Sequence, residues 1–155
     1  MQTMPNSLLS VSRLSQRGEG DCLPTCAQMV LTWLGRGKSW EFLCELFGTR
    51  SFGTPAANIL RLRQIGVRVT LDEIPRSSIT NYLARNQPVI AFINTADLPY
   101  WTVDTDHAVV VIGMDKTNVY LNDPYYADQT QQVTHAAFEL SQLRFNHLCA
   151  VLELE

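Results

Sequence analysis

The spacing of apolar residues predicts a helix that begins at Cys22. Between Cys22 and Leu34 the apolar side chains recur in steps of four, three, one, three and one, which is typical of one buried helix face. Gly35 provides a C-terminal stop, and Pro24 is tolerated because it lies in the first turn. The pattern therefore places Cys22 at a helix N-terminus, directly after the polar, glycine-containing loop 16–21.

The remaining segments predict short helices first and antiparallel strands later. Further helices are expected at 40–47 between Ser39 as N-cap and Gly48, at 54–65 opened by Thr54-Pro55, from a cap at Ser77 or Ser78 to about Asn86, and near 136–143. Strands are expected at 11–14, 67–71, 89–93, 107–113, 118–122, 131–134 and 148–154. This order favours an α+β fold in a single domain, residues 1–155.

Length and composition describe an ordinary globular protein. The chain has 155 residues, of which 46% are hydrophobic and 17% charged, so intrinsic disorder and collagen-like structure are excluded. Its net charge of −3 argues against a nucleic-acid partner, since phosphate-backbone binding needs a basic face. No apolar run approaches the about 20 residues of a membrane-spanning helix, and residues 1–7 lack the features of a signal peptide. We therefore expect a cytoplasmic protein, and the sequence leaves its oligomeric state and regulatory partners open.

The four cysteines are too few and too scattered for a disulfide framework. A zinc site is disfavoured as well, because Cys22 and Cys26 have no second pair at short spacing. We therefore expect neither a metal nor another cofactor. Cys26, Cys44 and Cys149 lie in apolar runs and are expected to be buried free thiols.

Cys22 differs from the other three because it is expected at a loop-to-helix corner. A thiol is nucleophilic only as its thiolate, and a helix N-terminus stabilises that negative charge through free N–H groups. The ordinary alternative is a buried first-turn cysteine, so the position alone does not decide between structure and chemistry. A nucleophilic cysteine also needs an imidazole base and an acceptor that fixes the imidazole tautomer.

His107 and Asp123 are the expected partners of Cys22. If the strands on either side of turn 114–117 pair so that Val111 faces Val119, the same register sets His107 opposite Asp123. Both side chains then project from one face, at the open end of an apolar strip, where the pair would face solvent. The ordinary alternatives are a histidine in a polar strand end and an Asn-Asp-Pro turn; jointly with Cys22, we favour the functional interpretation.

Other candidate residues depend on these three. Asp106 is a competing carboxylate that would point to the opposite strand face, and Asp104 is a weaker candidate. The Gln16 amide would complement the backbone N–H of Cys22 as a donor to an oxyanion. Tyr100 and Trp101 would form the wall of a peptide groove beside the base, although a buried Trp101 under the loop is at least as good an interpretation.

The chain resembles the papain-like cysteine peptidases, most closely the bacteriocin-processing peptidases of cysteine peptidase family 39 that cleave double-glycine leaders, and their stand-alone relatives. The resemblance rests on Gln16 and three segments, namely 21–31 (Asp-Cys-Leu-Pro-Thr-Cys-Ala-Gln-Met-Val-Leu), 106–113 (Asp-His-Ala-Val-Val-Val-Ile-Gly) and 120–124 (Tyr-Leu-Asn-Asp-Pro). It implies a papain-like fold, in which an N-terminal helical half packs on a C-terminal antiparallel sheet. It also implies Cys22 as nucleophile, His107 as base, Asp123 as its orienting partner and Gln16 as oxyanion donor.

Two features depart from the family pattern. Leu23 follows the nucleophile where the family usually has glycine, and its side chain would narrow the substrate groove or shift the N–H that completes the oxyanion hole. Many relatives are fused to an ABC transporter, whereas this sequence has no membrane segment and no nucleotide-binding loop. The leading hypothesis is a peptidase or isopeptidase that acts on a peptide or protein through an acyl-enzyme. The alternatives are a catalytically silent peptide-recognition module and a thiol acyltransferase.

Overall fold

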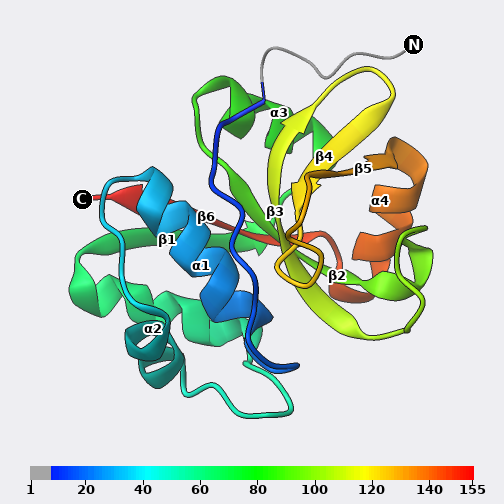
Figure 1. Ribbon diagram of the computed structural model, residues 1–155. Coiled ribbons are helices and arrows are strands. Elements are labelled where there is room, and N and C mark those ends of the chain that lie inside the picture. Colours follow the sequence, from blue (N-terminus) through cyan, green and yellow to red (C-terminus); the bar gives the residue numbers. More distant parts are fainter. Residues whose placement is uncertain (1–7) are drawn as a thin grey trace.

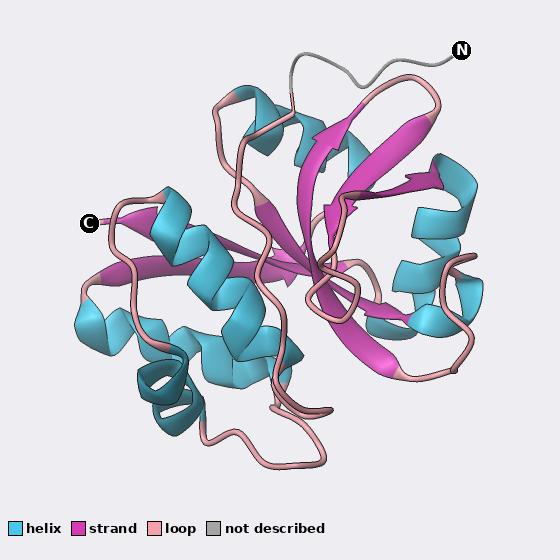
Figure 2. Cartoon of the chain, viewed as in Figure 1, coloured by secondary structure: helices cyan, strands magenta, loops and turns pink. Residues whose placement is uncertain are grey.

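The chain forms a six-stranded antiparallel sheet in the order β1-β6-β2-β3-β4-β5, and the helices pack against it (Figures 1 and 2). The computed structural model describes residues 8–155; residues 1–7, on which the expected lack of a signal peptide rests, lie outside this range. The strands are β1 (Val67–Glu73), β2 (Val89–Asn94), β3 (Asp106–Met114), β4 (Asn118–Asn122), β5 (Gln131–Thr134) and β6 (Leu148–Leu154). The helices are α1 (Cys22–Trp33), α2 (Trp40–Phe47), α3 (Arg76–Ala84) and α4 (His135–Gln142), with 3-10 helices η1 (Ala56–Ile65), η2 (Thr95–Asp97) and η3 (Leu143–Phe145).

Both faces of the sheet are covered, and β3 shows how the sequence achieves this. Successive side chains of a strand point to opposite faces. Val110 and Ile112 lie in the apolar cluster that includes the buried residues of α1, α2 and η1. Val109 and Val111 lie in the second cluster, with buried residues of α3 and α4. A strand buried on both faces has to be continuously apolar, as this one is.

Helix α1 begins and ends as the apolar spacing predicts. Cys26, one turn after Cys22, is fully buried, and its thiol donates a hydrogen bond of 3.4 Å to the carbonyl oxygen of Ala108 in β3. Gly35, just after the helix, adopts a φ of 77°, a left-handed conformation that glycine takes without strain. The helix therefore lies against β3 with its N-terminus near the beginning of that strand.

Helix α2 also matches its predicted bounds. The hydroxyl of Ser39 accepts a hydrogen bond of 3.1 Å from the backbone N–H of Phe42, and Gly48 ends the helix in the left-handed conformation. One expectation for α2 is wrong, because Cys44 is only half-buried. Cys26 and Cys149 are buried as expected.

Three local predictions are wrong. Residues 11–14 form no strand: this segment follows β3 and β4 through isolated contacts, such as the 2.9 Å hydrogen bond from the Asn122 side chain to the Val11 carbonyl. The helix expected at 54–65 is a 3-10 helix that begins at Ala56. Neither Ser77 nor Ser78 is an N-cap, because α3 already begins at Arg76, with Pro75 at the N-cap position.

The pairing of β3 with β4 differs from the predicted register by two residues. Val111 lies opposite Leu121 instead of Val119, and a bulge between Val111 and Gly113 shifts the pairing again towards the turn. A bulge inserts an extra residue into one strand, and alternating hydrophobicity does not reveal it in two strands that are apolar throughout. Up to the bulge, a shift of two residues leaves the side chains on their predicted faces.

The N-terminal segment runs beside β3 and leads to the beginning of α1 (Figure 1). The Leu9 N–H donates to the Ile112 carbonyl at 2.9 Å, and the Gln16 N–H donates to the Pro124 carbonyl at 2.8 Å. These contacts bring the loop before α1 close to the end of β4. Over residues 8–155, no helix is both long enough and apolar enough to cross a membrane.

Candidate active site

Cys22 is the first residue of α1, and the free N–H groups of this helix end are not occupied by a side-chain cap. The carboxylate of Asp21 turns back into the preceding loop, where it accepts the N–H groups of Arg17 at 2.8 Å and Gly18 at 2.7 Å. It also accepts the indole N–H of Trp40 at 2.7 Å. Cys22 is partly exposed, so its thiol combines access to solvent with the positive end of the α1 dipole.

His107 and Asp123 form a direct pair. The Nε2 atom of His107 lies 2.7 Å from Oδ1 of Asp123. The two residues are diagonal neighbours on one face of β3 and the end of β4, because the two-residue shift places Asp123 beyond Leu121 on that face. The prediction that the side chains of His107 and Asp123 meet is confirmed. The expectation that the pair would face solvent is wrong, since His107 is 6% and Asp123 only 1% exposed.

A buried carboxylate needs hydrogen-bond donors, and Asp123 has four. Oδ1 contacts His107 and accepts the backbone N–H of Tyr125 at 2.9 Å. Oδ2 accepts the Tyr100 hydroxyl at 2.7 Å and the Trp101 indole N–H at 2.9 Å. The aromatic ring of Trp101 also lies edge-on to the His107 ring, with centroids 4.8 Å apart. Together these contacts fix the position of the carboxylate and cover the imidazole.

The ionisation of this pair follows from its contacts. Burial by itself would lower the pKa of His107, but hydrogen bonding to Asp123 and Cys22, which accept from the ring, and the negative charges of both groups raise it to about 9. Burial likewise works against a charged Asp123, yet the hydrogen bond and charge of His107, with the Tyr100 and Trp101 donors, hold the pKa of Asp123 below its usual value. The pair therefore favours an imidazolium beside a carboxylate at neutral pH.

Cys22 lies near the same imidazole. Its side chain is close enough to contribute to the raised pKa of His107, and because Nε2 is taken by Asp123, Nδ1 is the ring nitrogen left for the sulfur. Cys22 and His107 also line one cavity of about 370 Å³. Cys22, His107 and Asp123 thus lie in one line from the N-terminus of α1 through β3 to the end of β4.

Gln16 lies beside this line. Its side chain lines a second cavity with His107 and Trp101. Its Nε2 donates to the carbonyl oxygen of Gly18, which uses one of the two amide N–H bonds. Within residues 8–155, Gln16 Oε1 is a buried polar atom without a hydrogen-bond partner.

The three residues predicted to contact substrate differ in their surroundings. Tyr100 and Trp101 direct their polar atoms at Asp123, and Trp101 alone of the two also lines the cavity beside Gln16. Leu23 is buried and lines the cavity that contains Cys22. Asp106 is exposed and pairs with Arg144 at 3.0 Å, away from the His107 ring, as its opposite strand face predicts.

The sequence analysis assigned no role to two acidic residues of the loop before α1, Glu19 and Asp21. Asp21 organises the loop, and Glu19 lines both cavities beside His107. The sequence held one signal, the acidic residue between Gly18 and Gly20, but nothing in it showed that the loop would lie against β3. Across the described residues, no group of three or more His, Cys, Asp or Glu side chains is arranged to hold a metal ion.

Comparison with known proteins places this arrangement in a family. Residues 8–149 match the model of the Peptidase_C39 like family. The chain belongs to this family. A search of curated proteins found no match. The resemblance inferred from the sequence is therefore confirmed at the level of the family.

Solved structures of C39 peptidases share the fold. A C39-like peptidase from Bacillus anthracis superposes with a TM-score of 0.78 at 16% identity, covering 96% of this chain and 97% of that one. A double glycine motif protease from an AMS/PCAT transporter, solved with its leader peptide, gives 0.75 at 19% identity, covering 97% and 96%. The peptidase domain of Streptococcus ComA, a bi-functional ABC transporter, gives 0.72 at 20% identity, covering 94% and 99%. These similarities confirm the papain-like α+β fold, and family and fold together support a cysteine peptidase function.

Proposed function

We propose that this protein is a cysteine peptidase that cleaves a peptide or isopeptide bond, with Cys22 as nucleophile, His107 as acid and base, and Asp123 as the group that orients His107. The catalytic machinery would lie within one domain, residues 1–155. The observation that carries the proposal is the 2.7 Å contact between His107 Nε2 and Asp123 Oδ1, with Cys22 at the N-terminus of α1 on the same cavity as His107. A protein that only bound peptides would have no need of this arrangement.

The proposed reaction uses the proton that the pair already holds. The Cys22 thiolate attacks the carbonyl carbon, so that a C–S bond forms and the carbonyl oxygen becomes an oxyanion. The C–N bond then breaks as the His107 imidazolium gives its proton to the leaving amine, which leaves an acyl group on Cys22 and a neutral imidazole. His107 next takes a proton from water, whose oxygen attacks the thioester and releases the acid and the free thiolate.

Asp123 has two functions in this scheme. Its contact with Nε2 keeps a proton on that nitrogen and leaves Nδ1 to exchange a proton with sulfur, the leaving amine and water. Its negative charge stabilises the imidazolium. The four donors around the carboxylate keep it in place, so Asp123 orients His107 without itself touching substrate.

The oxyanion would be bound by the backbone N–H of Cys22 and by the second amide N–H of Gln16. Both come from the segment that Asp21 organises at the N-terminus of α1. Removing one oxyanion donor typically costs about 10²–10³ in rate, so the contribution of Gln16 can be measured. A peptide or protein is the proposed substrate, which is supported by the cavities on both sides of His107 and by the relative solved with a leader peptide.

The proposal is tested with peptides that carry a thiol-trapping end group, varied at the two residues before the trap. We expect one covalent adduct, mapped by mass spectrometry to Cys22, and hydrolysis of the matching cleavable peptides. Cys22→Ser and His107→Gln should reduce hydrolysis to background. Cys44→Ser is the matched control, because Cys44 is the other partly exposed thiol, and it should retain full turnover.

Two results would replace the proposal with the alternatives. Saturable binding of peptides that the wild-type protein neither cleaves nor traps on Cys22 would indicate a recognition module. Transfer of the acyl group to an added amine in preference to water would indicate an acyltransferase that uses the same residues.

A further inference from the structure

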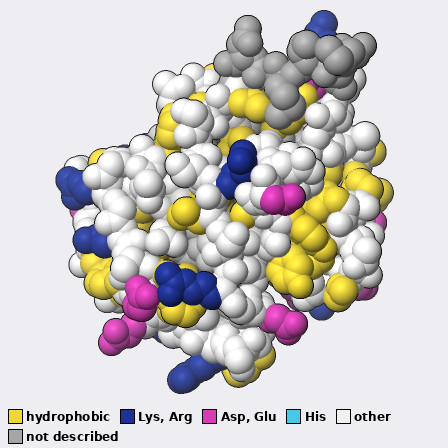
Figure 3. Space-filling view, viewed as in Figure 1, with side chains coloured by type: hydrophobic (Ala, Val, Ile, Leu, Met, Phe, Trp, Pro, Cys, Tyr) yellow, Lys and Arg dark blue, Asp and Glu magenta, His cyan; other side chains and the backbone are white. Residues whose placement is uncertain are grey.

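The cavity on the Gln16 side of Cys22 has a floor of aromatic rings and a single unpaired carboxylate at its border. Trp101, Tyr125 and Tyr126 pack against one another with ring centroids 4.8 to 5.1 Å apart. Tyr125 remains 50% exposed, and the face drawn in Figure 3 shows hydrophobic surface over the loop that follows β4. The cavity measures about 190 Å³, less than the about 300–1,000 Å³ of pockets for drug-sized ligands. It suits one side chain rather than a whole ligand.

Glu19 is held at the border of this cavity by its two neighbours. The Gly18 N–H is bound by the Asp21 carboxylate, and the Gly20 carbonyl accepts the Thr54 hydroxyl at 3.1 Å. Gly20 also lies so close to the turn at Arg50 that a Cβ atom there would be 2.0 Å from the Arg50 carbonyl oxygen. Glu19 is exposed between these two fixed points and lines the cavities on both sides of His107.

The carboxylate of Glu19 forms no ion pair or hydrogen bond within residues 8–155. Arg17 and Arg50 line a further cavity that Glu19 also borders, but Arg17 pairs with Glu41 at 3.1 Å, and neither cavity beside His107 is lined by a lysine or an arginine. The other acidic residue of both cavities, Asp106, is already paired with Arg144 at 3.0 Å and accepts the Asn94 amide at 3.2 Å. Glu19 is therefore the carboxylate that a substrate cation can use.

We infer that this cavity selects a basic side chain of the substrate, an arginine or a lysine, within about two residues of the cleaved bond. Glu19 provides the counter-charge and Tyr125 an exposed ring face, to which guanidinium and ammonium groups are attracted. Glu19 and Tyr125 are in this sense specificity-determining residues. The inference rests on the proposed peptidase function, to which it adds the class of substrate.

The experiment starts from a library of proteome-derived peptides that is digested by the wild-type protein and sequenced by mass spectrometry. We expect arginine and lysine to be enriched at one position next to the cut bonds. A cleaved peptide is then made in two forms, with arginine or with citrulline at that position, because citrulline keeps the shape and removes the charge. The kcat/KM ratio should favour arginine by about three- to thirtyfold, the combined effect of one exposed ion pair and one cation–π contact.

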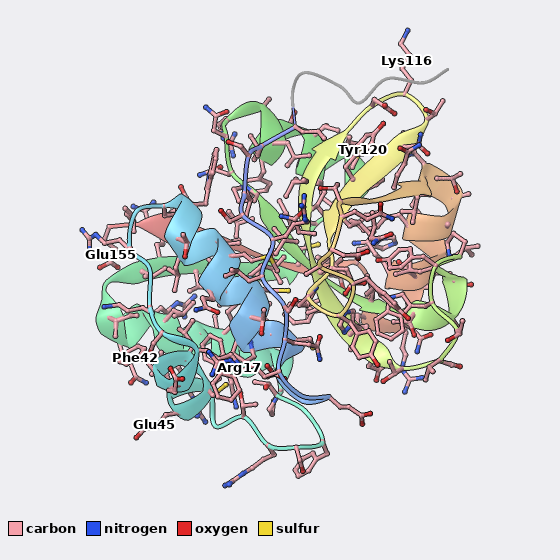
Figure 4. The ribbon with its side chains drawn as sticks, in the orientation of Figure 1. Arg17, Phe42, Glu45, Lys116, Tyr120 and Glu155 are labelled. Carbon is pink, nitrogen blue, oxygen red and sulfur yellow. The ribbon has the colours of Figure 1, made fainter. Side chains whose placement is uncertain are left out.

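Matched variants assign the preference to its residues. Glu19→Gln should reduce the arginine-to-citrulline ratio by about 1.5- to fivefold, since the ion pair is lost and only the ring contact remains. Tyr125→Leu should also reduce it, whereas Tyr125→Phe should preserve it. Glu45→Gln is the charge control, because Glu45 lies on the outside of α2 (Figure 4) and lines neither cavity. Added salt should weaken the wild-type preference, as exposed charges are screened.

The two proposals can fail separately. Cleavage without a basic preference, or a preference that survives Glu19→Gln, would overturn the inference and leave the peptidase standing. A wild-type protein that cuts no bond in the library would overturn the proposed function and this inference with it.

Discussion

Tyr100→Phe removes one donor from Asp123 while keeping the ring that packs around it. The hydroxyl lies 2.7 Å from Oδ2 of a carboxylate that is 1% exposed, and water cannot readily replace it. Hydrogen bonds to charged groups are worth about 1.5–3 kcal/mol, so we expect the free energy of unfolding near neutral pH to fall by about this amount. The same loss should reduce peptide hydrolysis, because the carboxylate that holds His107 is less firmly placed.

The pH dependence of this destabilisation has a definite sign. Burial opposes the charged form of Asp123, but its hydrogen bonds, led by that of His107, keep its folded-state pKa below 3.8. A group with a lowered folded-state pKa stabilises the protein above its unfolded pKa, and this stabilisation is lost as the pH falls through the folded value. The difference between wild type and Tyr100→Phe should therefore be largest near neutral pH and shrink in acid.

Urea denaturation at several pH values measures this difference, with Tyr126→Phe as the control. Tyr126 packs against Tyr100 with ring centroids 5.5 Å apart, but its hydroxyl makes no hydrogen bond within the described part of the chain. The control should cost less than about 0.5 kcal/mol. Equal costs for the two variants, or a Tyr100→Phe cost that does not change with pH, would refute the assigned role of the Tyr100 hydroxyl.

Two further predictions concern the orienting carboxylate and the loop before α1. Asp123→Asn should lower kcat/KM by about 10²–10⁴-fold without abolishing turnover, and it should move the alkaline limb of the pH–rate profile below the pKa of about 9 that Asp123 helps to give His107. Asp104→Asn is the control, because Asp104 is exposed and lies three residues before His107 in the chain; it should change neither kcat/KM nor the alkaline limb. An alkaline limb that stays in place in Asp123→Asn would contradict the assignment of Asp123 as the partner of His107. Gly20→Ala should destabilise the protein by about 1–3 kcal/mol in urea, because its Cβ would lie 2.0 Å from the Arg50 carbonyl oxygen. In Gly18→Ala the nearest atom would be 3.5 Å away, so equal losses in the two variants would show that this close approach is not the cause.

The sequence predicts best where both ends of an element carry a local signal. Helix α2 has Ser39 at one end and Gly48 at the other, and its bounds are as expected. Helix α1 has a regular apolar face that begins at Cys22, and this placed the candidate nucleophile. Where the end signals compete, as with Pro75 before Ser77 and Ser78, the start of α3 was misplaced.

The pair of His107 and Asp123 was predicted from a register that is wrong by two residues. The pairing still brings the two side chains together, because a two-residue shift keeps the strand face and the side chains reach diagonally. A one-residue shift would have separated them. Between the bulge near Ile112 and the turn the shift is three residues, and the bulge reduces it to two, which keeps His107 and Asp123 on one face. The bulge has no signal in a strand that is apolar on both faces.

The environment of the pair depends on contacts distant in sequence, and this part could not be predicted. Tyr100 and Trp101 lie 23 and 22 residues before Asp123, and only the folded chain shows that their polar atoms meet its carboxylate. The same holds for Glu19, whose place beside His107 follows from the path of the loop across β3. Hydrophobic alternation and the residues that begin or end helices describe single elements. They therefore predicted Cys22, His107 and Asp123 as candidates, but not the groups that surround them.

The central claim, that Cys22 is the nucleophile and His107 activates it, is tested most directly by the rate at which iodoacetamide alkylates each thiol near neutral pH. Cys22 should be modified faster than Cys44, and His107→Gln should remove most of this difference. Cys44 is an internal reference in the same sample, because it is the other partly exposed thiol and burial raises its pKa. Modification of Cys22 and Cys44 at the same rate, unaffected by His107→Gln, would contradict the account.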